Sequence, residues 1–295
     1  GVSGGWRPRA RADLDEQGMS RRHGDLYALN EGTALSGITA MGSGSAAGAQ
    51  AAGETAQGEP AAGEPAQGVP APLAILALDS ALRGCSVALL GGGRLLAEEA
   101  WAGPHGQAER LVPMVQRVMA AGGLAFAALD MIAVTIGPGS FTGLRVGLAV
   151  ARGLALACGR PLLGIGTLEA MAAAVAGEAC AGRPLLATID ARRGEIYAQL
   201  FAAGPDFAAL TAPCLTPLAA LPRLVPPGPL VIIGSGSALA AAALAPREVI
   251  IPAEIDRPEA AILARLALGR GVPPPGSPPP SPLYLRAPDA RLPAA

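Results

Sequence analysis

Short apolar runs and longer segments with helical spacing follow one another along most of this chain. A short apolar run between turn residues is typical of a buried strand, whereas apolar positions three and four residues apart are typical of an amphipathic helix. The sequence therefore predicts strands at 73–78, 85–90 and 94–101, followed by a helix at 105–121. A strand at 131–136, a helix from 140, a strand at 161–165 and a helix from 167 come next. Within the first of these helices, Pro113 predicts a kink or a later helix start.

A second set of elements follows and resembles a reduced copy of the first. Its strands are predicted at 184–189, 195–201, 230–233 and 249–251, with helices after 237 and at 258–269. A hairpin-led sheet that is extended by α/β crossovers is the layout of the ribonuclease-H-like half of actin, Hsp70 and the sugar kinases. We therefore expect a duplicated, two-lobed α/β fold of the actin-like (ASKHA) type.

The composition of the chain ends separates these lobes from their surroundings. Residues 1–72 are rich in Gly, Ala, Ser, Glu and Pro and predict a disordered low-complexity tail. The first lobe is expected at 73–180 and the reduced second lobe at 181–272. Residues 273–295 begin with a proline-rich stretch that is typical of an extended linker, followed by a short C-terminal segment.

The stretch TIGPGSFTGLRVGLAVARGLALA, at 135–157, predicts a strand, a tight glycine turn and a helix that is apolar almost all round. Ser140 or Thr142 can cap this helix. Gly143, Gly147, Ala151 and Ala155 form a line of small residues along it, which allows close approach by another element. A helix that is apolar on all sides has to be covered on all sides. The cover is either its own domain or a second helix from a partner, and we favour the partner.

The charged residues exclude several kinds of chemistry. All 22 basic residues are arginine, so a phosphate-binding or Schiff-base lysine is impossible. There are only 2 histidines, and one lies in the predicted tail, so the folded part cannot hold a two-histidine metal site. The 4 cysteines are far apart, which argues against a zinc ribbon and indicates a reducing compartment. No signal peptide or confident membrane span is visible, and we expect a cytoplasmic protein.

Two aspartates occupy equivalent positions in the two predicted lobes. Asp79 and Asp190 each end the first strand of a lobe, and in a duplicated fold they would face one cleft, where they could hold Mg²⁺ or position a water. Glycine turns after strands could cradle phosphate there. The alternative is that each aspartate only caps a turn. The residues assigned to this vestigial nucleotide cleft are Asp79, Ser80, Gly137, Gly139, Ser140, Asp190 and Gly234.

Several sequence blocks together resemble one bacterial family. LAILALDSALRGCSVALL, HGQAERLVPMVQRVM, IGPGSFTGLRVGLAVARGLA, GIGTLEAMA, LLATIDARRGEIYAQLF and the closing PLYLR are similar to the TsaB (YeaZ) family and follow its order over residues 73–288. Gly-Pro-Gly-Ser-Phe-Thr-Gly-Leu-Arg-Val-Gly and Ile-Asp-Ala-Arg-Arg-Gly-Glu-Ile-Tyr are the most specific blocks. One departure is Leu82, where the family usually has a hydroxyl residue, and this loss argues against nucleotide binding.

The resemblance implies a non-catalytic dimerisation subunit. TsaB proteins pair with TsaD, the catalytic paralogue, in threonylcarbamoyladenosine (t6A) modification of tRNA beside the anticodon. The ATPase TsaE joins the assembly, TsaB members form homodimers in isolation, and tRNA is contacted only through the complex. No tightly bound cofactor is implied for this chain, because ATP and metal belong to the partner subunits. The partner interface is expected at Leu111, Met114, Val115, Val118, Gly143, Arg145, Gly147, Ala151 and Arg152.

Two enzymatic functions remain as alternatives to this scaffold. A free-standing actin-like phosphotransferase or ATPase would use Asp79 and Asp190 to handle MgATP. A metal-dependent, glycoprotease-like peptidase is the other alternative, although no catalytic set for it can be assembled from the residues present.

Overall fold

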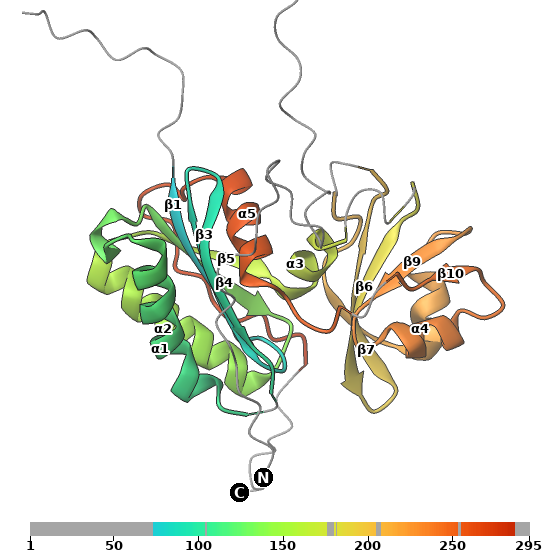
Figure 1. Cartoon of the computed structure of the whole chain (residues 1–295). Helices are drawn as coiled ribbons and strands as arrows, with labels where there is room; N and C mark the ends of the chain where they lie inside the picture. Colours follow the sequence, from blue (N-terminus) through green and yellow to red (C-terminus); the bar gives the residue numbers. More distant parts are fainter. Residues whose placement is uncertain are drawn as a thin grey trace, which may run out of the picture. The chain divides into compact units, whose positions relative to one another are not determined.

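A computed structural model describes residues 73–286, apart from 104, 176–179, 181, 205–207 and 253–254. The predicted tail at 1–72 and the last residues of the segment 273–295 lie outside the described residues. Within the described part, two sheets of five strands each carry the fold, with helices on their faces (Figure 1).

The first sheet has the strand order β3-β2-β1-β4-β5. Strands β1, β2 and β3 are antiparallel neighbours, whereas β4 and β5 continue the sheet in parallel from β1. Parallel neighbours need a crossover connection, and helix α2 supplies it between β4 and β5. The strands are β1 (Ala74–Asp79), β2 (Cys85–Gly91), β3 (Arg94–Trp101), β4 (Met131–Gly137) and β5 (Leu162–Gly166).

The second sheet repeats this plan in the order β10-β9-β6-β7-β8. An antiparallel meander of β6, β7 and β8 is again extended by two parallel strands on the side of the first meander strand. The strands are β6 (Leu185–Arg192), β7 (Glu195–Phe201), β8 (Cys214–Pro217), β9 (Leu230–Ile233) and β10 (Val249–Ile250). The matching topology confirms the duplicated, actin-like fold. Strand β8 was not predicted, because its four residues carry no clear alternation.

Helices cover both faces of the first sheet. On central strand β1, Leu76 and Leu78 face the cluster built with α1 (Gln107–Gly122) and α2 (Phe141–Cys158). Ile75 and Ala77 point to the other face, against α5 (Ala260–Arg270). This strict alternation is the period of a strand that is buried on both sides. Helix α1 continues through Pro113, so it does not start after the proline as one alternative expected.

Two helices contact the core of the lobe to which their position in the chain does not assign them. Helix α3 (Thr167–Ala173) falls within the expected first lobe, yet its Leu168 and Met171 belong to the core of the second sheet. Helix α5 falls within the expected second lobe, but Leu263 belongs to the core of the first sheet. Helix α4 (Ser237–Ala243) packs with the short helix Leu218–Arg223 on the opposite face of the second sheet. The boundaries 73–180 and 181–272 thus describe chain order, whereas α3 also contacts the first sheet through Ala170 and lies between the two cores, and α5 packs on the first sheet.

Helix α2 lies close to the turn between β1 and β2. Its N-cap is Ser140, whose side chain accepts a hydrogen bond from the Gly143 backbone N–H at 3.3 Å. A Cβ at Gly143 would overlap the backbone oxygen of Ser80, and one at Gly147 would lie 2.5 Å from the Ser80 Oγ. Ser80 Oγ in turn donates a hydrogen bond to the Gly143 carbonyl at 2.8 Å. The small residues therefore serve close approach inside the lobe.

We expect Gly143→Ala to destabilise the chain, because the new methyl group meets a backbone oxygen that cannot rotate away. Overpacking of this kind costs about 1–3 kcal/mol. Urea unfolding followed by circular dichroism measures the loss as a lower midpoint.

The matched control is Gly153→Ala, on the exposed side of the same helix. Nothing lies within 4 Å of a Cβ at this position. Alanine is the better helix former by roughly 0.5–1 kcal/mol, so this variant should be as stable as the parent or more so. Equal midpoints for the two alanine variants would contradict the packing described for Gly143.

Candidate functional site

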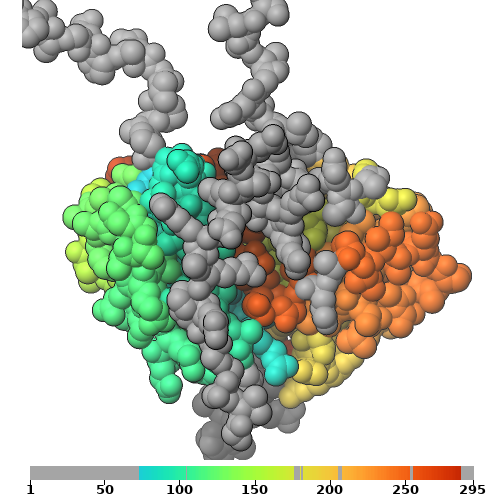
Figure 2. Space-filling view, viewed as in Figure 1, coloured from blue at the N-terminus to red at the C-terminus, as the bar shows by residue number. Residues whose placement is uncertain are grey.

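The outer face of α2 is apolar and largely uncovered. Only 28% of the residues of this 18-residue helix are buried. Among the described helices, it alone is long and apolar enough to cross a membrane by length and composition. Its inner side, with Leu144 and Leu148, packs on the first sheet. Its outer side leaves Leu156 at 85% and Phe141 at 54% exposure. Helix α2 is therefore a crossover helix with one apolar side turned outward. The green part of the chain, which includes α1 and α2, lies at the surface in Figure 2.

Helix α1 packs beside α2 and adds to this outer face through Val112, which is 45% exposed. We call the exposed side of the two helices the α1–α2 face and define it by Val112, Arg145, Ala149, Arg152, Gly153 and Leu156. The residues of this face are spaced three to four apart along α2, as one side of a helix requires.

Most residues predicted to contact a partner lie instead in the chain's own core. Their side chains are at most 3% exposed and pack against the first sheet, as do the two glycines that contact Ser80. The correction has a simple cause: apolar spacing marks the buried side of a helix before it marks any exposed side. The residues concerned are Leu111, Met114, Val115, Val118, Gly143, Gly147 and Ala151. Arg145 and Arg152 are exposed, as the predicted interface requires.

Both of these arginines contact the C-terminal segment. Arg145 Nε donates a hydrogen bond to the Tyr284 hydroxyl at 3.1 Å, and its guanidinium lies 3.6 Å from the centre of the Phe141 ring. Arg152 Nη2 donates to the Pro280 carbonyl at 2.5 Å. Sequence reasoning treated this segment as lying beyond a linker and missed its contact with α2. The closing block PLYLR was the only signal that pointed to it.

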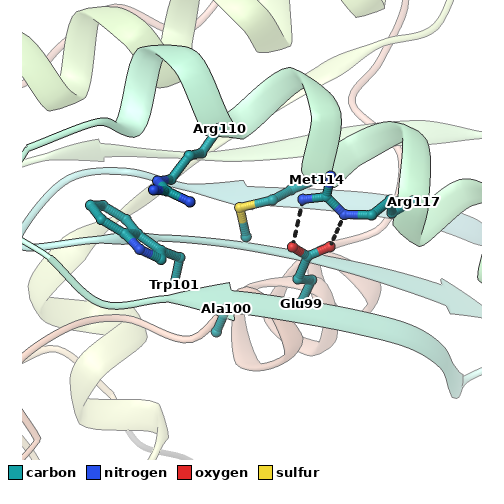
Figure 3. A pocket seen from close by; sticks show the side chains of 6 residues that line it. All are labelled: Glu99, Ala100, Trp101, Arg110, Met114 and Arg117. Carbon is teal, nitrogen blue, oxygen red and sulfur yellow. Dashed lines mark hydrogen bonds and ion pairs between the residues drawn. The ribbon is translucent and has the colours of Figure 1, made fainter. Parts of the chain in front are cut away.

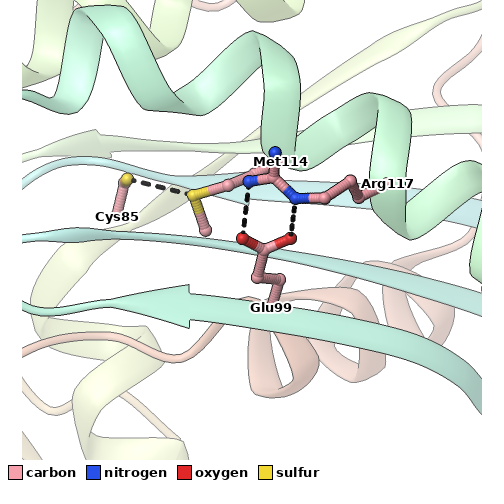
Figure 4. A network of polar contacts seen from close by, with 4 residues as sticks. All are labelled: Cys85, Glu99, Met114 and Arg117. Carbon is pink, nitrogen blue, oxygen red and sulfur yellow. Dashed lines mark hydrogen bonds and ion pairs between the residues drawn. The ribbon is translucent and has the colours of Figure 1, made fainter. Parts of the chain in front are cut away.

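A small cavity of about 130 Å³ lies between α1 and β3 (Figure 3). Arg110 stacks over the Trp101 ring at 4.6 Å on one side, and Arg117 forms a bidentate ion pair with Glu99 on the other, at 2.7 and 2.9 Å. Met114 forms part of the lining, and its sulfur lies 3.5 Å from the Cys85 thiol (Figure 4). Ligand pockets usually measure about 300–1,000 Å³, so this cavity has room for a side chain but not for a nucleotide.

Asp79 is buried at the end of β1, with 1% of its surface exposed. Its Oδ1 accepts hydrogen bonds from the Thr135 hydroxyl at 2.7 Å and from the Ala81 backbone N–H at 3.1 Å. Burial raises the pKa of this carboxyl from 3.8 to about 6, although these hydrogen bonds and the charge of Arg257 act to lower it. Asp79 therefore holds the turn that follows its own strand.

The glycine turn before α2 closes directly onto this turn. Ser140 N–H donates to the Ala81 carbonyl at 2.7 Å, and a Cβ at Gly139 would overlap the same oxygen. At Gly137, with φ of 117°, a Cβ would lie 2.8 Å from the Leu283 carbonyl oxygen. The two loops thus contact each other and the C-terminal segment, in the place where a phosphate cradle was expected.

The second predicted aspartate is engaged in a separate cluster. Asp190 accepts a hydrogen bond from the Arg192 backbone N–H at 2.8 Å and forms an ion pair with its guanidinium at 3.3 Å. The Asp190 N–H donates to Ser235 Oγ at 3.1 Å, and Gly234 approaches the Thr188 carbonyl too closely for a Cβ. Among the described residues, no recorded contact joins Asp79 to Asp190. The structure thus brings together Asp79, Ser80, Gly139 and Ser140, and separately Asp190 and Gly234.

Leu82, the departure noted in the sequence, lies partly buried against the core cluster of the second sheet that contains Leu168 and Met171. Through this leucine, the β1–β2 turn packs against the second lobe. Within the described residues, no group of three or more His, Cys, Asp or Glu side chains comes together as a metal site.

Comparison with known proteins agrees with this architecture. A family model described as TsaD, tRNA N6-adenosine threonylcarbamoyltransferase, matches residues 105–241. The tRNA threonylcarbamoyladenosine biosynthesis protein TsaB of Escherichia coli is 41% identical over 125 residues, which are 42% of this chain and 53% of that protein. The matched region thus spans about half the length of the first TsaB relatives.

Two further relatives are matched over most of their length. An uncharacterized protein of Mycobacterium tuberculosis is 32% identical over 219 residues, which are 74% of this chain and 93% of that protein. The solved structure of YeaZ from Pseudomonas aeruginosa superposes with a TM-score of 0.60 and 29% identity, covering 72% of this chain and all of that one. With these matches and the duplicated fold, the chain belongs to the TsaB (YeaZ) family.

Proposed function

We propose that this chain is a non-catalytic subunit that binds and activates a TsaD-type catalytic protein in the t6A modification of tRNA. Membership of the TsaB family supports the pathway, because a relative is named for threonylcarbamoyladenosine biosynthesis. The match of residues 105–241 to the TsaD model indicates shared ancestry with the catalytic subunit, as expected for paralogues that pair.

The observation that carries the proposal is the uncovered α1–α2 face. Isolated apolar side chains are common on protein surfaces, but contiguous apolar patches mark interaction sites. Leu156, at 85% exposure, and Val112, at 45%, lie on two helices that pack beside each other. A partner helix laid against them would bury these side chains and complete the cover that α2 lacks.

The arrangement of the inter-lobe loops supports a non-catalytic role. Phosphate binding needs backbone N–H groups that point into open space. Here the Ser140 N–H is bonded to the Ala81 carbonyl, and Leu82 packs against the second lobe. The buried Asp79 carboxylate would also repel the phosphates of a nucleotide.

The remaining partners follow from the same proposal. A TsaE-type ATPase joins the pair, and ATP and metal are bound by the partner subunits. In isolation the chain forms a homodimer through the same α1–α2 face. The tRNA is contacted only through the complex, which acts in the cytoplasm.

We expect Leu156→Glu to abolish pairing with the TsaD-type protein of the same organism. The substitution removes the apolar contact of Leu156 and puts a hydrated carboxylate into the interface, and hot-spot losses reach about 2 kcal/mol or more, which is roughly thirtyfold in Kd. Co-purification and size-exclusion chromatography measure pairing. Mass spectrometry of tRNA nucleosides then measures t6A formed with and without the chain.

Leu239→Glu is the matched control, since Leu239 is 40% exposed on α4 of the second lobe. It should pair and support t6A formation like the parent chain. If Leu156→Glu pairs normally while folded, the proposed interface is incorrect.

The isolated chain should show no heat of binding with millimolar MgATP in calorimetry, because Leu82 and the loop contacts around Ala81 fill the expected phosphate site. Micromolar binding would instead support the free-standing ATPase or phosphotransferase.

Asp79 gives a prediction about pH. Since its pKa is about 6 in the folded chain and 3.8 as the reference value, the folded state binds more protons between these pH values. Unfolding free energy should therefore fall as pH rises through this window, by about 3 kcal/mol at most. Asp79→Asn should remove this fall, measured by urea unfolding at pH 4 and pH 7. If the unfolding free energy of the parent chain and of the variant changed equally between pH 4 and pH 7, Asp79 would not take up a proton when the chain folds.

A further inference from the structure

The two arginines of the α1–α2 face have only neutral partners. Arg145 is held by the Tyr284 hydroxyl and the Phe141 ring, and Arg152 by the Pro280 carbonyl. Helix α2 carries no acidic residue along its 18 residues, and no ion pair to either arginine is recorded within the described part of the chain. Three other arginines, Arg117, Arg270 and Arg286, each pair with a glutamate. Among the described residues, the positive charge on this face is therefore uncompensated.

The C-terminal segment is fixed beside these arginines by its own contacts. The Leu283 N–H donates to the Ile136 carbonyl of β4 at 2.7 Å. Farther along, Arg286 pairs with Glu195 of β7 at 2.6 Å. Between these two anchors lies Tyr284, whose ring centre is 5.4 Å from that of Phe141. The segment thus reaches from the first sheet to the second and presents Tyr284 next to the start of α2.

The resulting cluster has the composition of an interface anchor. Phe141 is 54% exposed and Tyr284 43% exposed, and Arg145 lies against both. Aromatic residues and arginine dominate the residues that carry most of the energy of protein interfaces. Hydrogen bonds to Tyr284 and Pro280 hold both guanidinium groups in place before binding, which lowers the entropy lost on association.

We propose that the C-terminal segment 280–286 is part of the docking surface, and that the partner presents carboxylates to Arg145 and Arg152 beside an apolar side chain for Phe141 and Tyr284. This inference rests on the proposed pairing with a TsaD-type protein and adds the chemistry of the surface that must meet it. A guanidinium that becomes buried needs a counter-charge, and a carboxylate supplies it with charge-assisted hydrogen bonds.

A protein surface suits this site better than a nucleic acid. The two arginines are continuous with the apolar residue Leu156 on the same helix. The net charge of the whole chain is −1, so no wider basic surface is indicated. Phosphate backbones are bound by many cations together, whereas two cations beside exposed aromatic and aliphatic side chains fit an acidic and apolar protein patch.

The test compares dissociation constants for the TsaD-type protein at low and high NaCl. The parent chain should bind more weakly at high salt, because the charge pairs are screened. The double variant Arg145→Glu/Arg152→Glu should bind at least about tenfold more weakly at low salt, and its salt dependence should reverse, because high salt screens the new repulsion between carboxylates. Arg145→Met/Arg152→Met, which removes charge without adding repulsion, should lose the salt dependence.

Tyr284→Ala tests the contribution of the C-terminal segment and should weaken binding severalfold. Arg223→Glu is the charge control, because this arginine is exposed on the second lobe in the short helix Leu218–Arg223. It should leave the Kd and its salt dependence unchanged. Thermal unfolding of each variant confirms that the exposed substitutions leave the fold intact.

The outcomes separate this inference from the proposed function. If Leu156→Glu abolishes pairing while both double variants keep the parent Kd and salt dependence, the proposed function stands and this inference is overturned. If the double variants weaken tRNA binding but not protein pairing, the arginines serve nucleic acid and the inference is again overturned. If the parent chain shows no pairing at all, both proposals fail.

Discussion

The close approach of α2 to the β1–β2 turn is the packing contact on which the arrangement of the first lobe depends. Gly143 and Gly147 allow the helix to come down onto Ser80, and Ser80 Oγ bonds back to the Gly143 carbonyl. This contact fixes which side of α2 faces inward. It also fills the region between the glycine turn and the β1–β2 turn, where the sequence predicted a phosphate cradle. One packing constraint thus closes an internal site and turns an apolar helix side outward.

The elements of the fold followed well from the sequence, because buried strands and amphipathic helices leave a periodic signal. The alternation in β1 and the capped start of α2 at Ser140 are examples that the structure confirms. The orientation of α2 did not follow, because a helix that is apolar all round carries no signal for which side meets the sheet. The line of small residues therefore pointed to a partner, whereas Gly143 and Gly147 meet Ser80. For α1, the apolar residues Leu111 and Met114 were likewise assigned to a partner, although they lie in the chain's own core.

Contacts between segments far apart in sequence were the least predictable part. Helix α5 packs on the sheet of the other half, and α3 contributes to the cores of both sheets, so chain order alone places neither of them fully. Residues after the proline-rich stretch looked like the end of a linker, yet the Leu283 N–H bonds to Ile136 and Tyr284 reaches Arg145. Both features depend on single hydrogen bonds or on complementary shapes between distant segments. No local pattern of apolar residues encodes them.

Asp79 shows why an aspartate at the end of the first strand is weak evidence for catalysis in such a fold. An aspartate at the end of the first strand is what a phosphotransferase needs, but there the carboxylate must be exposed to metal or water. Here it is 1% exposed and accepts hydrogen bonds from Thr135 and Ala81. Burial raises the pKa of this carboxyl to about 6, and its Oδ1 is engaged by these two donors within the turn. The carboxylate at this strand end therefore holds its own turn, and the exposed side of α2 is the surface through which we propose that the chain functions.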